Sequence, residues 1–383
     1  MRRTNCISED SGILKDVLTF KDFPVHIGGT DQESQFDAFH DMTWGSCIYC
    51  GLIQLTDSPS QELVYREQST IYAIGPTWQR HHEAFAKFIS ESNPLAVLEI
   101  GGAHGVLSVE FNRLTGKNIG WRIIEPNPSP IPECKASFIT GYFESVDFEI
   151  LPADMVVHSH VLEHALEPAN FLRTASEKML PGQKMGVSIP NLKKWFDKGH
   201  PNALNFEHTY LLTEVVAELL FKKSGLKILR REEFGGSHSI FFILEKNEEG
   251  RNLEAKLEYD DQDTRLLINN FNLRKQFVEL CNRELEIHVG DAFLFGGSIF
   301  SQQLINLGLN SDSITSVLDN DPSKDGKRLY GSNLRIALPD KMRTSHSPLV
   351  IVDCGEYNEE ISNQLLELKP DTKIIVFNHS KRV

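Results

Sequence analysis

The feature that most constrains the fold is a regular alternation of strand-like and helix-like segments between residues 95 and 245. Short apolar runs alternate with longer segments whose apolar residues recur at helical spacing, a pattern typical of an α/β domain with a doubly wound parallel sheet. One helix is expected over residues 161–180. The last two strands, 226–234 and 239–246, are joined only by the sequence GGSH. Because so short a link cannot hold a crossover helix, these strands are expected to pair antiparallel.

Changes in this pattern divide the rest of the chain. The N-terminal part is rich in cysteine and turn residues, and a segment with helical spacing follows it and closes at Asn93-Pro94. A charged helical stretch comes after the α/β domain, and the strand and helix alternation then restarts. The expected segments are a small module at 1–57, a helical linker at 58–93, the main α/β domain at 94–246, a second helical linker at 247–285 and a smaller Rossmann-like unit at 286–383.

Composition excludes several classes of protein. With 383 residues, 40% hydrophobic and 24% charged, the chain is typical of a soluble globular protein. A formal net charge of −14 argues against a nucleic-acid-binding surface. No apolar segment resembles a secretory signal or a membrane span, so we expect a cytoplasmic protein that contacts no membrane. Six cysteines in so long a chain do not indicate a disulfide framework.

The stretch LEIGGAHGVLS at 98–108 places a carboxylate, Glu99, at the end of an apolar strand and three glycines directly after it. In open α/β sheets, ligands bind beyond the carboxyl ends of the strands, and glycines let the backbone approach them closely. The spacing does not fit G-x-G-x-x-G; it fits acidic-x-G-x-A-x-G. A nucleotide-type cofactor is therefore expected here, the alternative being an ordinary strand-to-helix turn with capping acids.

This pattern resembles the first motif of class I S-adenosylmethionine-dependent methyltransferases. The resemblance implies that Glu99 lies near the amino-acid end of the cofactor and that Glu125, at the end of the next strand, accepts both ribose hydroxyls. Phe143, with Tyr142, is expected to stack on adenine, although such an aromatic is often a core residue. The full expected cofactor set is Glu99, Gly101, Gly102, Ala103, Gly105, Glu125, Phe143, His158, Ser159 and His160.

The order of motifs along nearly the whole chain is similar to that of the sugar C-methyltransferases of bacterial deoxysugar pathways. These motifs are a cysteine module, T-W-x-x-H-H, E-I-G-G, V-L-E-H, an E-H after the fifth strand, G-G-S after the sixth, and V-L-D-N-D-P-S-K-D-G. The family methylates carbon 3 of nucleotide-linked 4-keto-6-deoxy sugars. The resemblance implies that His208 is the base that forms an enolate, that Glu207 is its partner, and that His164 lies near the ketone. As a bare dipeptide, Glu207-His208 is also typical of a protein surface.

The chain departs from this family at two positions, because Asn205-Phe206 stand where the family often has Tyr-His. Tyr72 or Tyr210 is expected to replace the missing tyrosine, and Tyr72 and Asn205 are the expected substrate-binding residues.

The family's N-terminal module holds one structural zinc ion through two C-x-x-C pairs. Here Cys47 and Cys50 form the second pair, whereas the first keeps only Cys6 and has Glu9 at its partner's position. Three thiolates still suit a tetrahedral zinc site with histidine as the fourth ligand. The resemblance favours His26 over His40 for that ligand, and a module without metal is the alternative.

The expected fold is thus an α/β, class I methyltransferase Rossmann-like central domain with a small N-terminal zinc module and a C-terminal Rossmann-like domain. The glycines of the C-terminal unit do not fit a dinucleotide motif, so no second cofactor is expected there. The expected partner is a nucleotide-linked ketosugar, with no nucleic acid, and the chain is expected to be a monomer or dimer. Two other functions remain open, an O- or N-methyltransferase acting on such a sugar and an NAD-dependent oxidoreductase.

Overall fold

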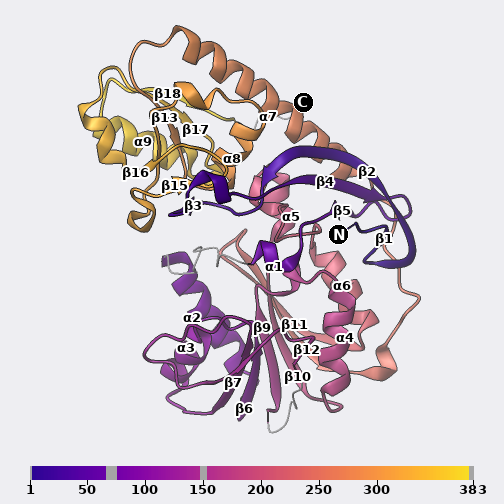
Figure 1. Cartoon of the computed structure of the whole chain (residues 1–383). Coiled ribbons are helices and arrows are strands. Elements are labelled where there is room, and N and C mark those ends of the chain that lie inside the picture. The colour runs from indigo at the N-terminus through magenta and orange to yellow at the C-terminus, as the bar shows by residue number, and fades with distance from the viewer. Residues whose placement is uncertain (1, 66–75, 147–152, 379–383) are drawn as a thin grey trace.

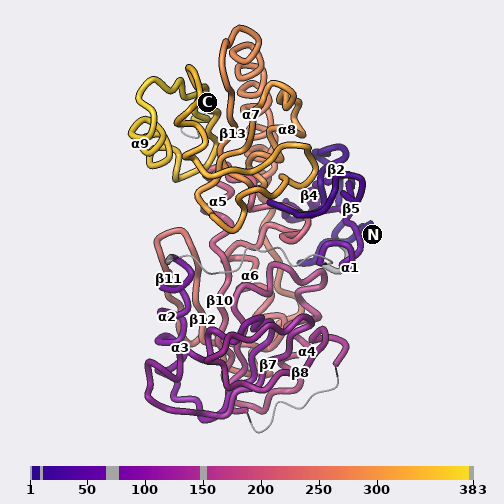
Figure 2. The backbone as a smooth tube through the Cα atoms, turned by 60° about the vertical axis from the view of Figure 1, so that its left-hand side comes forward, coloured from indigo at the N-terminus to yellow at the C-terminus, as the bar shows by residue number. Residues whose placement is uncertain are grey.

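The computed structural model describes residues 2–65, 76–146 and 153–378. They form three units (Figure 1): an N-terminal antiparallel sheet, a central α/β domain and a C-terminal α/β unit. Figure 2 shows from a second direction that the N-terminal sheet lies beside the junction of the other two units. Among the described residues, no helix is both long and apolar enough to span a bilayer.

The N-terminal module is a sheet of order β1-β2-β4-β5 in which every neighbouring pair is antiparallel. Its inner face is formed by large apolar side chains, among them Phe23, Met42 and Trp44, each 1% exposed. Burial of such side chains is what holds a small sheet together. The elements are β1 (Asn5–Cys6), β2 (Glu9–Pro24), β3 (Gly29–Thr30), β4 (Phe39–Cys47), β5 (Ile53–Asp57) and the short helix α1 (Gln61–Val64).

The central domain is a seven-stranded sheet of order β11-β12-β10-β9-β6-β7-β8. Only β12 runs antiparallel to its neighbours, so both the parallel sheet and the antiparallel last pair are confirmed. The strands are β6 (Ala96–Ile100), β7 (Gly120–Glu125), β8 (Ser137–Thr140), β9 (Met155–Ser159), β10 (Lys184–Pro190), β11 (Leu226–Phe234) and β12 (Ser239–Lys246).

Helices cover both faces of this sheet (Figure 1). On one face, α2 and α3 bury Phe85, Phe88 and Phe111 against the strands, and on the other α4 and α6 bury Phe171 and Leu220. This two-sided cover explains why the central strands are apolar throughout rather than alternating. The helices are α2 (Pro76–Ser90), α3 (Val106–Thr115), α4 (Pro168–Lys178), α5 (Leu192–Asp197) and α6 (Glu214–Lys223).

The single helix expected over 161–180 is wrong. The structure has a short 3-10 turn at Leu162–His164, and α4 starts only at Pro168. Proline fits the first turn of a helix, where its missing N–H is not needed, and it disfavours helical conformation in the residue before it. The interruption leaves Glu163 and His164 on a loop beyond the carboxyl end of β9.

The C-terminal unit follows the long helix α7 (Gln262–Ile287) and has a five-stranded sheet of order β16-β14-β13-β17-β18. All its strand pairs are parallel, which confirms a second, smaller α/β unit. Its elements are β13 (Ala292–Phe295), α8 (Ile299–Asn306), β14 (Ser316–Leu318), β15 (Arg328–Leu329), β16 (Ile336–Ala337), β17 (Leu349–Val352), α9 (Asn358–Leu368) and β18 (Lys373–Val376).

The N-terminal module and the C-terminal unit are joined directly. Strand β15 pairs antiparallel with β3. Beside it, the Arg328 guanidinium donates two hydrogen bonds of 2.6 Å to the two carboxylate oxygens of Asp37. These side chains are 6% and 1% exposed, and a bidentate pair of this kind is geometrically specific.

Candidate functional site

The glycine turn between β6 and α3 has the backbone that the sequence motif requires. Gly101 and Gly105 have φ of +74° and +72°, in the left-handed region that favours glycine. A Cβ at Gly101 would lie 2.5 Å from a methyl carbon of Val161. The turn therefore packs against the loop that follows β9, two residues before Glu163. This contact joins the loops at the carboxyl ends of two neighbouring strands, β6 and β9.

The two strand-end carboxylates have different surroundings. Glu99 is 3% exposed and accepts a hydrogen bond of 2.7 Å from the Trp121 indole, and burial raises its pKa to about 7. Glu125 is half-buried and accepts 3.0 Å hydrogen bonds from the backbone N–H groups of Ala103 and Asn127. Because a carboxylate can accept about four hydrogen bonds, Glu125 can shape the turn and still bind hydroxyl groups.

Two of the expected cofactor residues lie in the hydrophobic core. His158 is 0% exposed, its ring lies 5.4 Å from that of Phe171, and burial lowers its pKa to about 3. Phe143 is 5% exposed and also packs against Phe171, at 5.0 Å. This placement favours the core role for Phe143 that the sequence left open. Ser159 is the last residue of the inner strand β9, at its carboxyl end. His160 follows it with a φ of +54°.

The structure brings His164 and His208 together, with ring centres 5.1 Å apart. Nδ1 of His208 lies 2.9 Å from the carbonyl oxygen of Asn202. A carbonyl only accepts, so Nδ1 must carry the proton, which leaves Nε2 of the neutral ring with its lone pair. Burial lowers the pKa of His208 to about 4 and that of His164 to about 3. Both rings are therefore neutral at pH 7.

Glu163 is a residue that the sequence argument missed. It is 0% exposed, and neither carboxylate oxygen has a hydrogen-bond partner among the described residues. One oxygen lies 3.4 Å from Nδ1 of His160 and 3.9 Å from Nε2 of His164. Burial raises the pKa of this carboxyl to about 8. Glu163 is part of the V-L-E-H motif, but only the histidine of that motif was assigned a role from the sequence.

The loop that carries His208 is held by its own side chains and by the N-terminal module. The Asn205 side-chain oxygen accepts hydrogen bonds from the backbone N–H groups of Glu207 and His208, at 2.7 and 3.0 Å. Asn205 thus shapes the loop, whereas the sequence predicted that it binds substrate. Strand β5 adds backbone hydrogen bonds from Leu55 to Thr209 and from Leu211 to Ile53.

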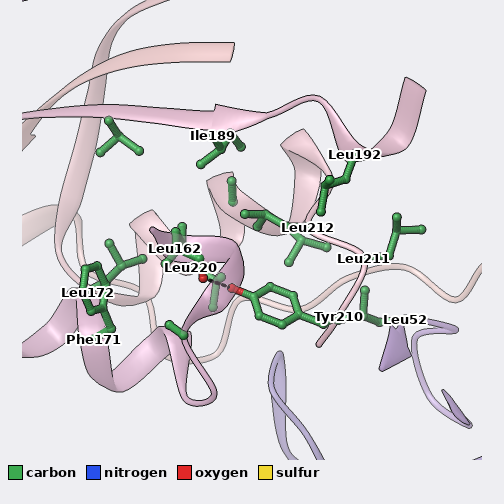
Figure 3. Close-up of a cluster of buried hydrophobic side chains, with 14 of the residues drawn as sticks. Leu52, Leu162, Phe171, Leu172, Ile189, Leu192, Tyr210, Leu211, Leu212 and Leu220 are labelled. Carbon is green, nitrogen blue, oxygen red and sulfur yellow. Dashed lines mark hydrogen bonds between the residues drawn. The ribbon is translucent and has the colours of Figure 1, made fainter. Parts of the chain in front are cut away.

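Tyrosines surround this loop, but not as the sequence suggested. Tyr210 is 0% exposed, and its hydroxyl donates to the Leu162 carbonyl (Figure 3). Burial raises its pKa well above the usual value, so it holds the 162–164 turn. Tyr65, which was not predicted, has its hydroxyl 3.3 Å from Nδ1 of His164. Tyr72 lies outside the described residues.

A cleft of about 230 Å³ opens beside His164. Tyr65, Phe206 and Thr209 also line it, together with Ser58, Pro59, Gln61, Val64 and Leu166. Its walls come from the N-terminal module, α1 and the two loops of the central domain. A polar group in this cleft would lie against the His164 imidazole.

The three predicted thiol ligands also converge. The sulfur atoms of Cys6, Cys47 and Cys50 lie within 4.8 Å of one another, and all three residues are buried. Hydrogen bonds, first from Cys50 and also from Ser8 and Gln54, lower the pKa of Cys6 to about 5, so it has thiolate character. A cluster of buried thiols with a stabilised thiolate fits a structural zinc ion.

The predicted histidine ligand does not join this cluster. His26 packs edge-on against Tyr330, 5.0 Å away. His40 lies 3.4 Å from the carboxylate of Asp57. The Ser8 hydroxyl stands instead beside the thiols, 3.0 Å from the Cys6 sulfur and 3.4 Å from the Cys50 sulfur. His26 is therefore corrected as a ligand, because it lies in the bend between β2 and β3, and this bend leads to the C-terminal unit.

Comparison with known proteins agrees with this architecture. Residues 73–231 match a family model described as "Methyltransferase domain", and no curated protein matches the chain. Similar solved structures include the mitomycin 7-O-methyltransferase, with 17% identity, 43% of this chain and 54% of that chain covered, and a TM-score of 0.36. A putative O-methyltransferase from Nostoc punctiforme has 17% identity, coverages of 45% and 57%, and a TM-score of 0.36.

The N-methyltransferase NodS from Bradyrhizobium japonicum has 13% identity, coverages of 45% and 98%, and a TM-score of 0.34. The chain spans little more than half the length of the first two structures. The domain match and the observed sheet, with its single antiparallel strand, define a class I methyltransferase Rossmann-like fold. Residues 73–231 are therefore similar to a methyltransferase domain.

Proposed function

We propose that this protein transfers a methyl group from S-adenosylmethionine to carbon 3 of a nucleotide-linked 4-keto-6-deoxy sugar. The observation that carries the proposal is the state of His208, a neutral, half-buried imidazole whose Nδ1–H is held by the Asn202 carbonyl, so that Nε2 carries the lone pair that can accept a proton. Methylation of oxygen or nitrogen needs no carbanion, whereas methylation of a carbon beside a ketone does.

The glycine turn fits the donor. Gly101 and Gly105 give the turn its left-handed backbone, Glu99 lies at the strand end, and Glu125 accepts from the Ala103 N–H of the turn with acceptor capacity to spare. When bound, S-adenosylmethionine supplies an electrophilic methyl group. The protein's share is to hold donor and acceptor in line, which accounts for a large part of the rate in such reactions.

On the acceptor side, His208 removes the proton from carbon 3, and the electron pair of the broken C–H bond forms the enolate. His164 and Tyr65 stand at the cleft wall, with the tyrosine hydroxyl 3.3 Å from Nδ1 of the histidine. Because one of the two donates to the other in this contact, the remaining proton lets one of them donate to the enolate oxygen. The enolate carbon would then take the methyl group as the methyl–sulfur bond of the donor breaks and S-adenosylhomocysteine leaves, and the proton remains on His208 until it passes to water. Glu207, on the same loop, favours the imidazolium that this step creates.

Isotope exchange tests the proposal directly. In D₂O without cofactor, the wild-type chain is expected to replace hydrogen by deuterium at carbon 3 of a nucleotide-linked 4-keto-6-deoxy sugar, as mass spectrometry would show. With S-adenosylmethionine, the same sugar gains one methyl group. Absence of exchange together with methylation would favour the O- or N-methyltransferase alternative. Calorimetric binding of NAD but not of S-adenosylhomocysteine would instead favour an oxidoreductase.

We further propose that the Cys6, Cys47 and Cys50 cluster holds a structural zinc ion. Nothing in methyl transfer through an enolate requires this metal, so its role would be to fix the module that supports the His208 loop. The cytoplasm remains the compartment proposed from composition, since free thiols persist there.

A further inference from the structure

We propose that His81, His160 and His238 form a second metal site, which binds a divalent ion of the zinc class through three imidazole nitrogens. The site is separate from the thiol cluster and goes beyond methyl transfer. The three residues come from three elements: α2, the loop after β9, and the turn between β11 and β12. Only the folded central domain brings them together.

The spacing of the three rings fits a tetrahedral ion. One nitrogen of each ring lies within 4.8 Å of the others. The ring centres are 5.1 Å apart for His81 and His160, 5.3 Å for His81 and His238, and 5.8 Å for His160 and His238. Three imidazoles bound tetrahedrally at Zn–N distances of about 2.0–2.1 Å place their ring centres about 5 Å apart.

His81 has the hydrogen-bonding pattern of a ligand. It is 0% exposed, and its Nε2 lies 3.0 Å from the Ser188 hydroxyl. Its Nδ1 is buried and has no hydrogen-bond partner in the described part of the chain. A metal-binding histidine uses one ring nitrogen for the ion and holds the other with an outer partner. A buried ring nitrogen without a partner otherwise costs stability.

The groups around the other two rings complete the site. The Glu163 carboxylate lies 3.4 Å from Nδ1 of His160, the carboxylate–histidine arrangement common behind metal ligands. The Ser239 hydroxyl lies 2.9 Å from Nε2 of His160 and 2.7 Å from Nδ1 of His238. Its oxygen therefore lies within hydrogen-bond distance of both rings. A dication here would also favour the ionised form of the buried Glu163 carboxyl, whose oxygens have no hydrogen-bond partner among the described residues.

Burial suits the rings to this task. His81 is fully buried and His160 and His238 are half-buried, and the neutral imidazole is the form that binds metal. Trp78 covers the cluster, with its ring 5.2, 4.8 and 4.9 Å from those of His81, His160 and His238. Nitrogen ligands of this kind suit zinc, and also copper, nickel and iron.

Metal content tests the site without any activity measurement. The full chain, saturated with zinc and freed of loose ion on a desalting column, is analysed by mass spectrometry of the metal. His238→Gln and His160→Gln are each expected to contain one zinc ion fewer than the wild type. His82→Gln is the matched control, since His82 is a neighbouring histidine on the same helix outside the cluster, and it should match the wild type.

The Cys47→Ser/Cys50→Ser double variant removes the thiol site and so distinguishes the two sites. Adding His238→Gln to this double variant should lower its zinc content by one further ion. Equal zinc in wild type and both histidine variants overturns the proposal, whatever the activity.

A second measurement avoids dependence on folding of the variants. Cobalt(II) added to the double variant after chelation should quench Trp78 fluorescence in a saturable one-to-one manner, and Trp78→Phe should remove most of the quenching. No saturable quenching overturns the proposal as well.

Discussion

At the level of single residues, the chemistry assigned to His208 depends on one backbone carbonyl. The Asn202 oxygen fixes the tautomer of the ring, and the Asn205 side chain fixes the loop that presents it. Neither residue needs to touch a substrate to matter, because a base acts only from the correct position and in the correct protonation state.

Replacement of His208 by glutamine should lower turnover by about 10²–10⁴-fold, the usual contribution of a positioned base, while the affinity for S-adenosylhomocysteine stays within about twofold. Methyl gain by mass spectrometry and calorimetric titration measure the two quantities. His200→Gln, on the same loop but packed against Phe300, is the control and should keep near wild-type turnover. Similar losses in both variants would mean that the loop, not the imidazole, was being tested.

The pH profile gives an independent check on the same residue. The active form of His208 is neutral, and burial lowers its pKa to about 4. Turnover should therefore stay level from pH 8 to pH 6 and fall only as pH approaches 4. Because the folded pKa lies below the unfolded value of about 6.5, the unfolded chain binds protons first, so stability also falls below pH 6.5. Initial rates measured after a rapid pH jump separate the loss of activity from the loss of stability. A midpoint of the activity profile near pH 6.5 would contradict the assignment of His208 as the base.

Residue-level prediction from the sequence was uneven for physical reasons. His164 and His208 were singled out by residue type and motif, and the structure places their rings together. Glu163, Tyr65 and the Ser8 hydroxyl were missed, because their importance comes from burial and from neighbours far away in the chain. The same limit explains His26, whose direction depends on a strand pairing with residues near 329.

At the level of elements, the glycine turn and the broken helix after β9 decide where the site lies. The alternation of strands and helices was visible in the sequence because hydrophobic periodicity is local. The interruption at Pro168 was also visible in principle, since Glu167-Pro168 disfavours a continuous helix. It was overlooked because the segment's apolar residues keep helical spacing on both sides of the break.

Two glycines provide a matched test of the turn. Gly105 and Gly116 have φ of +72° and +65°, so alanine at either position carries a similar backbone strain of about 1–2 kcal/mol. A Cβ at Gly105 would also lie 2.2 Å from the Cys134 sulfur, whereas nothing lies within 4 Å of one at Gly116. Gly105→Ala should lose about 1–3 kcal/mol more stability than Gly116→Ala, as urea unfolding would measure. Equal losses would show that the turn can shift freely.

At the level of the whole molecule, the N-terminal module contacts both the central domain at the candidate site and the C-terminal unit. Strand β5 supports the His208 loop, and β3 with Asp37 ties the same module to the C-terminal unit. This arrangement could not be derived from the sequence, because nothing local in residues 29–37 indicates a partner near residue 328.

The buried ion pair between Asp37 and Arg328 should carry much of this connection. Asp37→Ala leaves a buried guanidinium without its carboxylate, a change that costs about 3–5 kcal/mol. Asp41→Ala removes an exposed, solvent-screened ion pair with Lys21 from the same module and should cost much less stability. Denaturant unfolding of the full chain compares the two variants. Equal small losses would mean that the junction is held by the strand pairing alone.

The pairing of β3 with β15 has a further consequence for synthesis on the ribosome. Residues 29–30 emerge long before residues 328–329, so the nascent N-terminal segment waits, with an unpaired edge, through the translation of nearly three hundred residues. Exposed edges of this kind invite wrong partners. A chain that stops before residue 328 would therefore leave β3 without its native partner strand.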